Sequence, residues 1–310
     1  LLVFIDAVNQ LPSGDPARRL AWLPAELPDH CKVVVSTIPG DTLDAAASRS
    51  PEMLEVVPFP AGDAEELLET WLRNAGRDLQ PAQRREVLDS FAAAGSLVLY
   101  LKLAFEEARL WRSTDEDVAL ADTIHGLIRD DLFARLMDKK NHGKLFVERA
   151  LGYLAASRYG LTEDELLTVL SRDDEVFGWV AGQQFHDIRS ISEGEPAIPV
   201  VLWARLRADL EPYLAEYGAD GATTLDFYHP QFREVAAAEF LEQDADGVLG
   251  SKGRDRHSSL ADHFRAAVDV REDGAWSGTW TGPDIRGLAE LPYHLIEAGR
   301  FDEIVRHCDL

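Results

Sequence analysis

A single aspartate follows a run of five apolar residues at the start of the sequence. Leu1–Ile5 is apolar throughout, and Asp6 comes directly after it. Such a run predicts a parallel strand that is buried on both faces, with one carboxylate at its carboxyl end. Ligands of open α/β sheets bind beyond the carboxyl ends of the strands, so Asp6 stands where a ligand site is expected. An aspartate that caps the next turn is the alternative that these residues leave open.

The elements that must position Asp6 alternate between strands and helices. Further strands are predicted over 31–37 and 54–59, and a short helix over 17–27. This alternation predicts a parallel sheet. We therefore expect residues 1–60 to form an α/β domain.

From residue 61 onward the apolar residues recur with the period of a helix rather than that of a strand. We expect a small helical domain over 61–138, a second domain over 144–243, and a C-terminal helical region over 256–310. In the second domain, helices precede a short strand pair, which suggests a winged helix. A long loop is predicted there over 172–198.

Two local signals mark helix starts in the second domain. Thr162, with Glu165 three residues later, predicts a capping box. His229 follows the predicted strand 223–228, and Pro230 then stands at the first position of a helix. The helix that follows Thr162 would be the recognition helix, but its charges are acidic, which argues against DNA binding.

The composition indicates a globular protein with few polyanionic partners. Of the 310 residues, 46% are apolar, and 55 acidic residues against 31 basic ones give a net charge of −24. A chain this acidic is poorly suited to bind nucleic acid or an anionic membrane, and no apolar run approaches the ~20 residues of a membrane helix. Cys31 and Cys308 form no disulfide framework, which fits the reducing cytoplasm.

Six segments, in their order along the chain, resemble the NACHT branch of the STAND class of NTPases, and especially telomerase-associated-protein-like and NACHT/WD-repeat proteins. They cover nearly the whole chain. The segments resemble, in turn, a Walker B strand, sensor 1, the helix after the nucleotide-contacting loop, two parts of the winged helix and the junction into repeats: Leu1–Leu11, Lys32–Gly40, Leu99–Arg109, Gly160–Leu167, Phe227–Phe232 and Leu291–Leu295.

The resemblance implies a fold of α/β followed by mostly α. It would comprise the C-terminal part of a P-loop NTPase parallel sheet, a small helical domain, a winged helix and the start of a helical repeat region. The chain would then be a fragment that starts at Walker B, because no GxxxxGK[ST] loop occurs in it. We expect the intact parent to bind ATP or ADP with Mg²⁺, and the fragment alone to bind neither.

The resemblance also gives roles to individual residues. Asp6 would hold the magnesium ion through water, and Ser36 or Thr37 would hydrogen-bond the γ-phosphate. His229 would contact the β-phosphate of ADP and hold the off state. The alternatives are that hydroxyl residues commonly end strands, and that His229 caps a helix or is half-buried.

Asn9 and Gln10 stand where the family carries further acids, one of which orients water. An amide can hydrogen-bond a water molecule but cannot take its proton near neutral pH. The resemblance therefore implies, at best, a slow and degenerate NTPase, with Asn9 and Gln10 as the catalytic positions.

The function implied by the resemblance is a signal-transduction ATPase. The parent would switch between an ADP-bound closed form and an ATP-bound oligomer, and relay a signal from C-terminal repeats to an N-terminal effector. The Ala-rich, Arg-over-Lys composition suggests a GC-rich bacterial genome. For a bacterial member, the resemblance implies a role in phage defence or regulation. Two alternatives remain: a non-enzymatic scaffold with a decayed nucleotide site, and a winged-helix transcription regulator.

Overall fold

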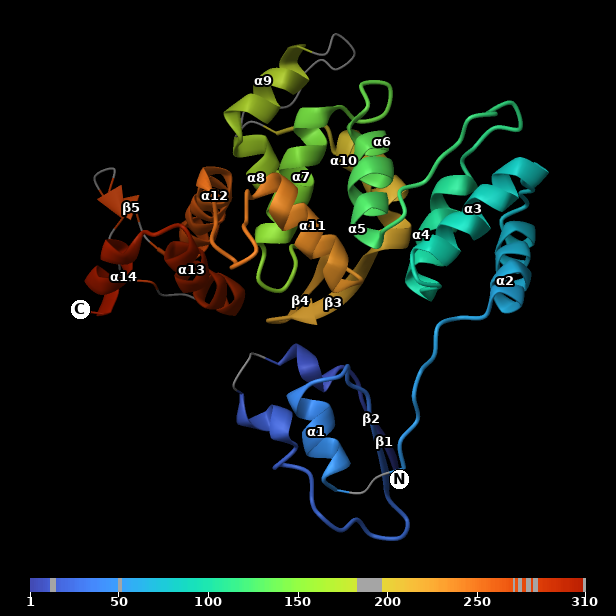
Figure 1. Ribbon diagram of the computed structural model, residues 1–310. Coiled ribbons are helices and arrows are strands. Elements are labelled where there is room, and N and C mark those ends of the chain that lie inside the picture. Colours follow the sequence, from blue (N-terminus) through green and yellow to red (C-terminus); the bar gives the residue numbers. More distant parts are fainter. Residues whose placement is uncertain are drawn as a thin grey trace. The chain divides into compact units, whose positions relative to one another are not determined.

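The computed structural model divides into two compact units, Leu1–Val57 and Pro58–Leu310. The first is drawn in blue in Figure 1. The predicted set of domain boundaries stays a prediction. The structure describes the following residues: 1–11, 15–49, 52–182, 197–269, 271–272, 275–276, 280 and 284–308.

The first unit is built on a pair of parallel strands. Strands β1 (Leu2–Ile5) and β2 (Lys32–Val35) are hydrogen-bonded in register, from Leu2 opposite Lys32 to Ile5 opposite Val35. Two 3₁₀ helices, η1 and η2, and the short helix α1 complete the unit: Val8–Gln10, Pro16–Arg19 and Asp41–Ala47. Two strands are compatible with part of an α/β domain, and the P-loop fold itself stays a prediction.

The prediction that the first strand is buried on both faces is wrong. Exposed and half-buried residues alternate along both strands, and Phe4 is 70% exposed. Side chains of a strand point alternately to opposite faces, so a two-stranded sheet that is covered on one face leaves every second residue open.

Two further predictions for the first sixty residues are wrong. Residues 52–60 contain no strand, and Leu54 and Val56 are 91% and 92% exposed. A lone extended segment has no neighbour to pair with, so its apolar sequence does not make it a strand. The helix predicted over 17–27 is only the single turn of η2, which ends at Leu20 with a positive φ of 56°.

Helices account for the start of the second unit, as the sequence predicts. Their apolar stripes meet in one core, which includes Leu68, Val87 and Leu101. The last of these helices contains seven residues of π-helix between α5 and α6. In order, α2, α3, α4, α5, the π-helical segment and α6 are Ala61–Asn74, Pro81–Ala93, Val98–Ala108, Ile124–Gly126, Leu127–Phe133 and Ala134–Met137.

The middle of the second unit combines helices with an antiparallel hairpin. The hairpin strands β3 and β4 pair from Leu214 opposite Phe227 to Ala219 opposite Ala222, and Leu161 adds an isolated bridge to Leu225. This order of elements is compatible with a winged helix, which stays a prediction. The elements α7, α8, α9, α10, β3, β4 and α11 are Lys144–Ala156, Glu163–Arg172, Asp174–Gly182, Val200–Leu210, Leu214–Ala219, Ala222–Phe227 and Pro230–Phe240.

Local signals in this region are partly confirmed. The capping box of α8 is present: Glu165 N–H donates to the Thr162 hydroxyl at 3.1 Å, and Thr162 N–H donates to the Glu165 carboxylate at 2.8 Å. The loop predicted over 172–198 is wrong in its first part, where α9 forms because Val176 and Val180 lie one turn apart and are both buried. Residues 183–196 of that loop lie outside the described residues.

The C-terminal helices pack as a pair. Helices α12 (Ser251–Val268) and α13 (Ile285–Glu297) lie side by side, and α14 (Phe301–Cys308) follows. Between α12 and α13 in the sequence, the two-residue strands β5 (Arg271–Glu272) and β6 (Ala275–Trp276) form an antiparallel pair. No helix in the described part of the chain is long and apolar enough to cross a membrane.

A polar seam joins this helix pair to α8. We use this name for His257 on α12, for Arg286, Glu290 and His294 on α13, and for Glu165 on α8. Arg286 donates to both oxygens of Glu165, at 2.6 and 2.9 Å, and the His257 and His294 Nδ1 atoms are 2.9 Å apart. His294 Nε2 lies 3.4 Å from the Glu290 carboxylate. The Glu290 carboxyl group and the two imidazoles are therefore held away from water.

The protonation states of the seam follow from its burial. Burial lowers the pKa of His257 and His294 to about 3, with smaller contributions from His294 and from Arg286 respectively. Burial raises the pKa of Glu290 to about 7, against the opposing effect of Arg286. Both histidines are therefore neutral at pH 7, and Glu290 holds a proton more tightly in the folded chain than in the unfolded one.

We predict that Glu290→Gln gains stability relative to the unaltered chain as the pH rises from 4.5 to 7. Over that window folded Glu290 binds a proton that the unfolded chain has released, so the unaltered chain loses stability as the pH rises. At about 1.36 kcal/mol for each pKa unit, the difference should grow by roughly 3 kcal/mol and then stay constant above pH 7. Urea unfolding measured at a series of pH values tests this. The control is Glu65→Gln on the exposed surface of α2, and a constant difference for Glu290→Gln would contradict the prediction.

Candidate functional site

The carboxyl edge of β1 and β2 brings two of the predicted residues together. Because Ile5 is opposite Val35, the next residues, Asp6 and Ser36, emerge side by side. The Ser36 hydroxyl donates to Asp6 Oδ1 and accepts from Ala7 N–H at 2.8 Å. Ser36 therefore orients the Asp6 carboxylate as well as ending the strand.

A sharp turn after Asp6 carries the chain across the end of β2. Ala7 has a positive φ of 51°, and Val8 N–H donates to the Ser36 carbonyl at 3.2 Å. The turn brings the Asn9 side-chain oxygen to Ile38 N–H, 3.3 Å away. Asn9 thus bridges the two strand ends, and its side-chain oxygen is already engaged in a hydrogen bond.

Thr37 and Gln10 are less involved in this network. The Thr37 hydroxyl donates to the neighbouring Ile38 carbonyl at 3.1 Å. Within the described ranges the exposed Gln10 side chain has no hydrogen-bond partner. The roles of both residues toward a nucleotide stay predictions.

Sequence reasoning missed one cation at this edge. Arg18 on η2 donates through Nε to the Leu11 carbonyl at 2.8 Å and through Nη2 to the Asn9 carbonyl, and it lies 3.4 Å from Asp41. It therefore fixes the segment that carries Asn9 and places a positive charge beside it. No motif marks Arg18, because it reaches the edge only through the fold of the loop.

The donors at this edge fit a magnesium ion that keeps most of its water. The side chains of Asp6, Ser36 and Thr37 offer only oxygen, which is what Mg²⁺ prefers. Asp6 is exposed, and its second carboxylate oxygen has no partner among the residues that the structure covers. No group of three or more metal-ligating side chains occurs in the same residues, so the site fits a hydrated ion rather than a closed cage.

His229 belongs to the second unit, where it caps α11. Its Nδ1 accepts from Gln231 N–H at 3.3 Å, and burial lowers its pKa, against the opposing effect of Glu234. The ring is therefore neutral at pH 7 with its proton on Nε2, which remains a hydrogen-bond donor. The capping role is present, and the contact with a phosphate stays a prediction.

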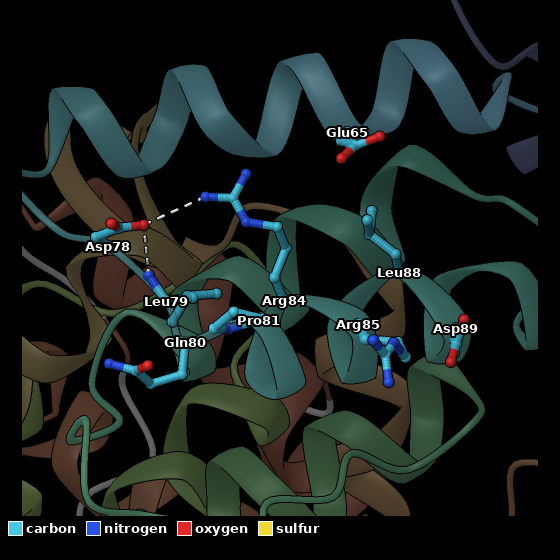
Figure 2. Close-up of a pocket in the computed structure, with 9 residues that line it drawn as sticks. All are labelled: Glu65, Asp78, Leu79, Gln80, Pro81, Arg84, Arg85, Leu88 and Asp89. Atoms are coloured by element: carbon cyan, nitrogen blue, oxygen red, sulfur yellow. Dashed lines mark hydrogen bonds and ion pairs between the residues drawn. The ribbon is translucent and has the colours of Figure 1, made fainter.

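A groove between α2 and α3 is separate from all predicted site residues. Its volume is about 620 Å³, and Figure 2 shows Glu65 on α2 above the side chains of α3 and the loop before it. Asp78 and Arg84 pair across part of it at 3.2 Å. Charges of both signs line the groove, so it shows no preference for an anion such as a nucleotide.

We predict that Ser36→Ala loosens the turn after Asp6. The Ala7 N–H would lose its acceptor, and its hydrogen exchange should speed up roughly fivefold to tenfold, the effect of about one net hydrogen bond. NMR-detected exchange on the 310-residue chain measures this. Thr37→Ala is the matched control, since that hydroxyl contacts only its neighbouring carbonyl. An unchanged Ala7 rate in Ser36→Ala would show that the hydroxyl does not hold the turn.

The chain is similar to curated proteins over almost all of its length. It is 34% identical to human NACHT domain- and WD repeat-containing protein 1 over 98% of the chain and 20% of that protein. It is 29% identical to mouse NACHT and WD repeat domain-containing protein 2 over 97% of the chain and 17% of that protein. A TPR repeat-containing protein of Dictyostelium discoideum is 19% identical over 98% of the chain and 16% of its own length.

The chain spans about a fifth of the length of the human and mouse NACHT domain- and WD repeat-containing protein 1. No family model matches it, and no solved structure matches it. The matches nevertheless extend over 97–98% of the chain. The chain therefore belongs to the NACHT branch, as a homologue of one segment of the NACHT and WD repeat-containing proteins.

Proposed function

We propose that the chain is part of a signalling ATPase that works as an ATP/ADP-controlled switch of oligomerisation. The observation that carries the proposal is the pairing of Asp6 with Ser36 at the carboxyl edge of two parallel strands. Nucleotides bind at such edges in α/β sheets. The similarity to NACHT and WD repeat-containing proteins supports the same reading.

In this proposal several residues at the carboxyl edge of β1 and β2 contact the nucleotide. Asp6 would hold hydrated Mg²⁺ through its second carboxylate oxygen, while Ser36 keeps the carboxylate in its orientation. Thr37 or Ser36 hydrogen-bonds the γ-phosphate. The ion, when bound, neutralises charge on the phosphate oxygens. His229, which belongs to the second unit, would donate from Nε2 to the β-phosphate of ADP and thereby favour the closed form.

Hydrolysis in this site is slow. Asn9 and Gln10 can orient water but cannot take its proton, and a missing general base costs ~10²–10⁴ in rate. Arg18 brings a positive charge to this edge, but it is engaged with the carbonyls of Asn9 and Leu11. Slow hydrolysis suits a switch, because the ATP-bound state then persists long enough for an oligomer to assemble.

The partners in this proposal follow from the relatives. Their names record WD repeats, and we extend this to C-terminal repeats that sense a signal in the parent of this chain. A winged helix made of α7, α8, α10 and the β3–β4 hairpin would pass that signal toward an N-terminal effector. The parent is proposed to work in the cytoplasm.

A scaffold with a decayed nucleotide site is the second candidate. It is favoured by the Asn9 side chain, whose oxygen already bonds Ile38 N–H and so takes a structural role. A transcription regulator is disfavoured by charge. Arg207 on α10 is neutralised by Glu163 at 2.9 Å and Glu216 at 3.0 Å, and the first turn of α8 is acidic.

We predict that Gln10→Glu speeds ATP turnover at least tenfold in the protein that contains this chain. A carboxylate at this position would supply the base that the amide lacks. Single-turnover hydrolysis of radiolabelled ATP measures the rate. Gln10→Met is the control, since it keeps the length of the side chain without a base and should not speed turnover. An unchanged rate in Gln10→Glu would remove Gln10 from the catalytic role, and rapid turnover by the unaltered protein would favour a different base.

The 310-residue chain by itself should not bind ATP at micromolar concentration. Backbone N–H groups of a glycine-rich phosphate loop supply most contacts to a nucleotide's phosphates, and the sequence contains no GxxxxGK[ST] motif. Titration calorimetry with MgATP tests this. Micromolar binding would mean that other residues of the chain hold the phosphates, and the roles given to Asp6 and Ser36 would have to change.

A further inference from the structure

Two adjacent glutamates are buried at the end of α4, a helix that is otherwise largely apolar. Glu106 and Glu107 are each 5% exposed. Glu107 accepts from Arg135 Nε at 2.7 Å and from Arg135 Nη2 at 2.8 Å, so the pair is bidentate. Its Oε1 also lies 3.3 Å from the hydroxyl of Tyr213, which is 106 residues away in sequence.

The charges at this place are balanced within the chain. Glu106 is paired with Lys102 and Arg109, so each carboxylate has a cationic partner. Burial and the negative charge of Glu107 raise the pKa of Tyr213 well above its usual range. The phenol therefore keeps its proton, and its hydrogen bond to the carboxylate is charge-assisted.

Tyr213 connects this carboxylate to the N-terminal end of α11. Its carbonyl accepts from Tyr228 N–H at 3.2 Å, and its ring lies 5.4 Å from that of Phe232. The Tyr228 ring also packs on Phe232 at 5.4 Å. In the sequence, His229 lies between Tyr228 and Phe232, and its carbonyl accepts from Phe232 N–H at 3.1 Å. His229 is thus linked to Tyr213 through its neighbours Tyr228 and Phe232.

The other end of α11 is held separately. The Phe240 ring packs on Phe133 of the π-helical segment at 5.2 Å. The surface pair of His125 with Glu234, at 3.4 Å, adds little because both side chains are exposed. The helix itself is also held by Arg233, which donates to the Asp226 carboxylate and to the Ala155 and Ser157 carbonyls. If the contact at Tyr213 opens, the turn at Tyr228 and His229 therefore loosens while α11 stays attached.

We propose that Glu107, together with Arg135, holds the Tyr213 hydroxyl and so fixes His229 with respect to α4 and α6. We call this arrangement of Glu107, Arg135 and Tyr213 the lock. The lock joins the helices of residues 61–137 to the hairpin and to α11. It does not depend on what His229 binds, and it would exist in a switch and in a scaffold alike. Glu107 and Tyr213 are positioning residues, since both act on His229 through other groups.

The test is Tyr213→Phe in the 310-residue chain, which removes one hydroxyl and keeps the ring. Hydrogen exchange of the Tyr228 and Phe232 amides should speed up about tenfold or more, the effect expected for a hydrogen bond to a charged group. In an NMR titration, the pKa of His229 should rise toward 6.5 as its ring becomes more exposed. Exchange within α12 and α13 should not change.

Tyr153→Phe is the matched control. Tyr153 is also buried, and its hydroxyl lies 3.5 Å from the Asp173 carboxylate. It should leave the Tyr228 amide and the pKa of His229 unchanged. A second variant, Glu107→Gln, should change both readouts in the same direction as Tyr213→Phe. Unchanged readouts in Tyr213→Phe, or equal changes in Tyr153→Phe, would overturn the lock.

Discussion

The parallel register of β1 and β2 is the constraint from which the proposed nucleotide edge follows. With Ile5 opposite Val35, the two strands end together, and Asp6 and Ser36 meet. The turn at Ala7 then carries the chain across the end of β2, where Asn9 meets Ile38 N–H. A slip of one residue would turn Asp6 away from Ser36 and separate these groups.

Paired buried charges play the corresponding role in the second unit. Glu107 with Arg135, Glu165 with Arg286, and Asp226 with Arg233 each join elements that are distant in sequence or lie on either side of a turn. Removing one partner of a fully buried pair typically costs ~3–5 kcal/mol, because a buried charge is left uncompensated, and the cost is smaller where Arg135, Asp226 and Arg233 are partly exposed. These pairs fix where α6, α11 and α13 lie, and apolar packing alone would specify their positions less strictly.

What could be predicted from the sequence was local. The first two strands, the capping box at Thr162 and the helix that begins at Pro230 each have a signal within a few residues, and the structure contains them. The contact of Tyr213 with Glu107 has no such signal, because it depends on how several helices meet. The same holds for Arg18, which reaches Asn9 only through the path of a loop.

The wrong predictions have a common physical origin. Apolar residues were taken to mean burial, yet whether Phe4 or Leu54 is covered depends on neighbours that the residue types do not specify. The helix α9 was missed because the whole of 172–198 was judged by its polar residues and glycines, although Val176, Phe177 and Val180 lie within it. Family resemblance was more informative than periodicity here, because six weak segments in one order restrict the fold more than any single pattern does.

The most direct test of the central claim is magnesium-dependent nucleotide binding by the protein that contains this chain. The affinity for a non-hydrolysable ATP analogue should be compared between the unaltered protein and Asp6→Asn, with Mg²⁺ and with EDTA. Asp44→Asn, which changes an exposed carboxylate on α1, is the control. The account predicts that Asp6→Asn weakens binding at least tenfold with Mg²⁺ and has no effect in EDTA. Equal affinities with Mg²⁺ would contradict it.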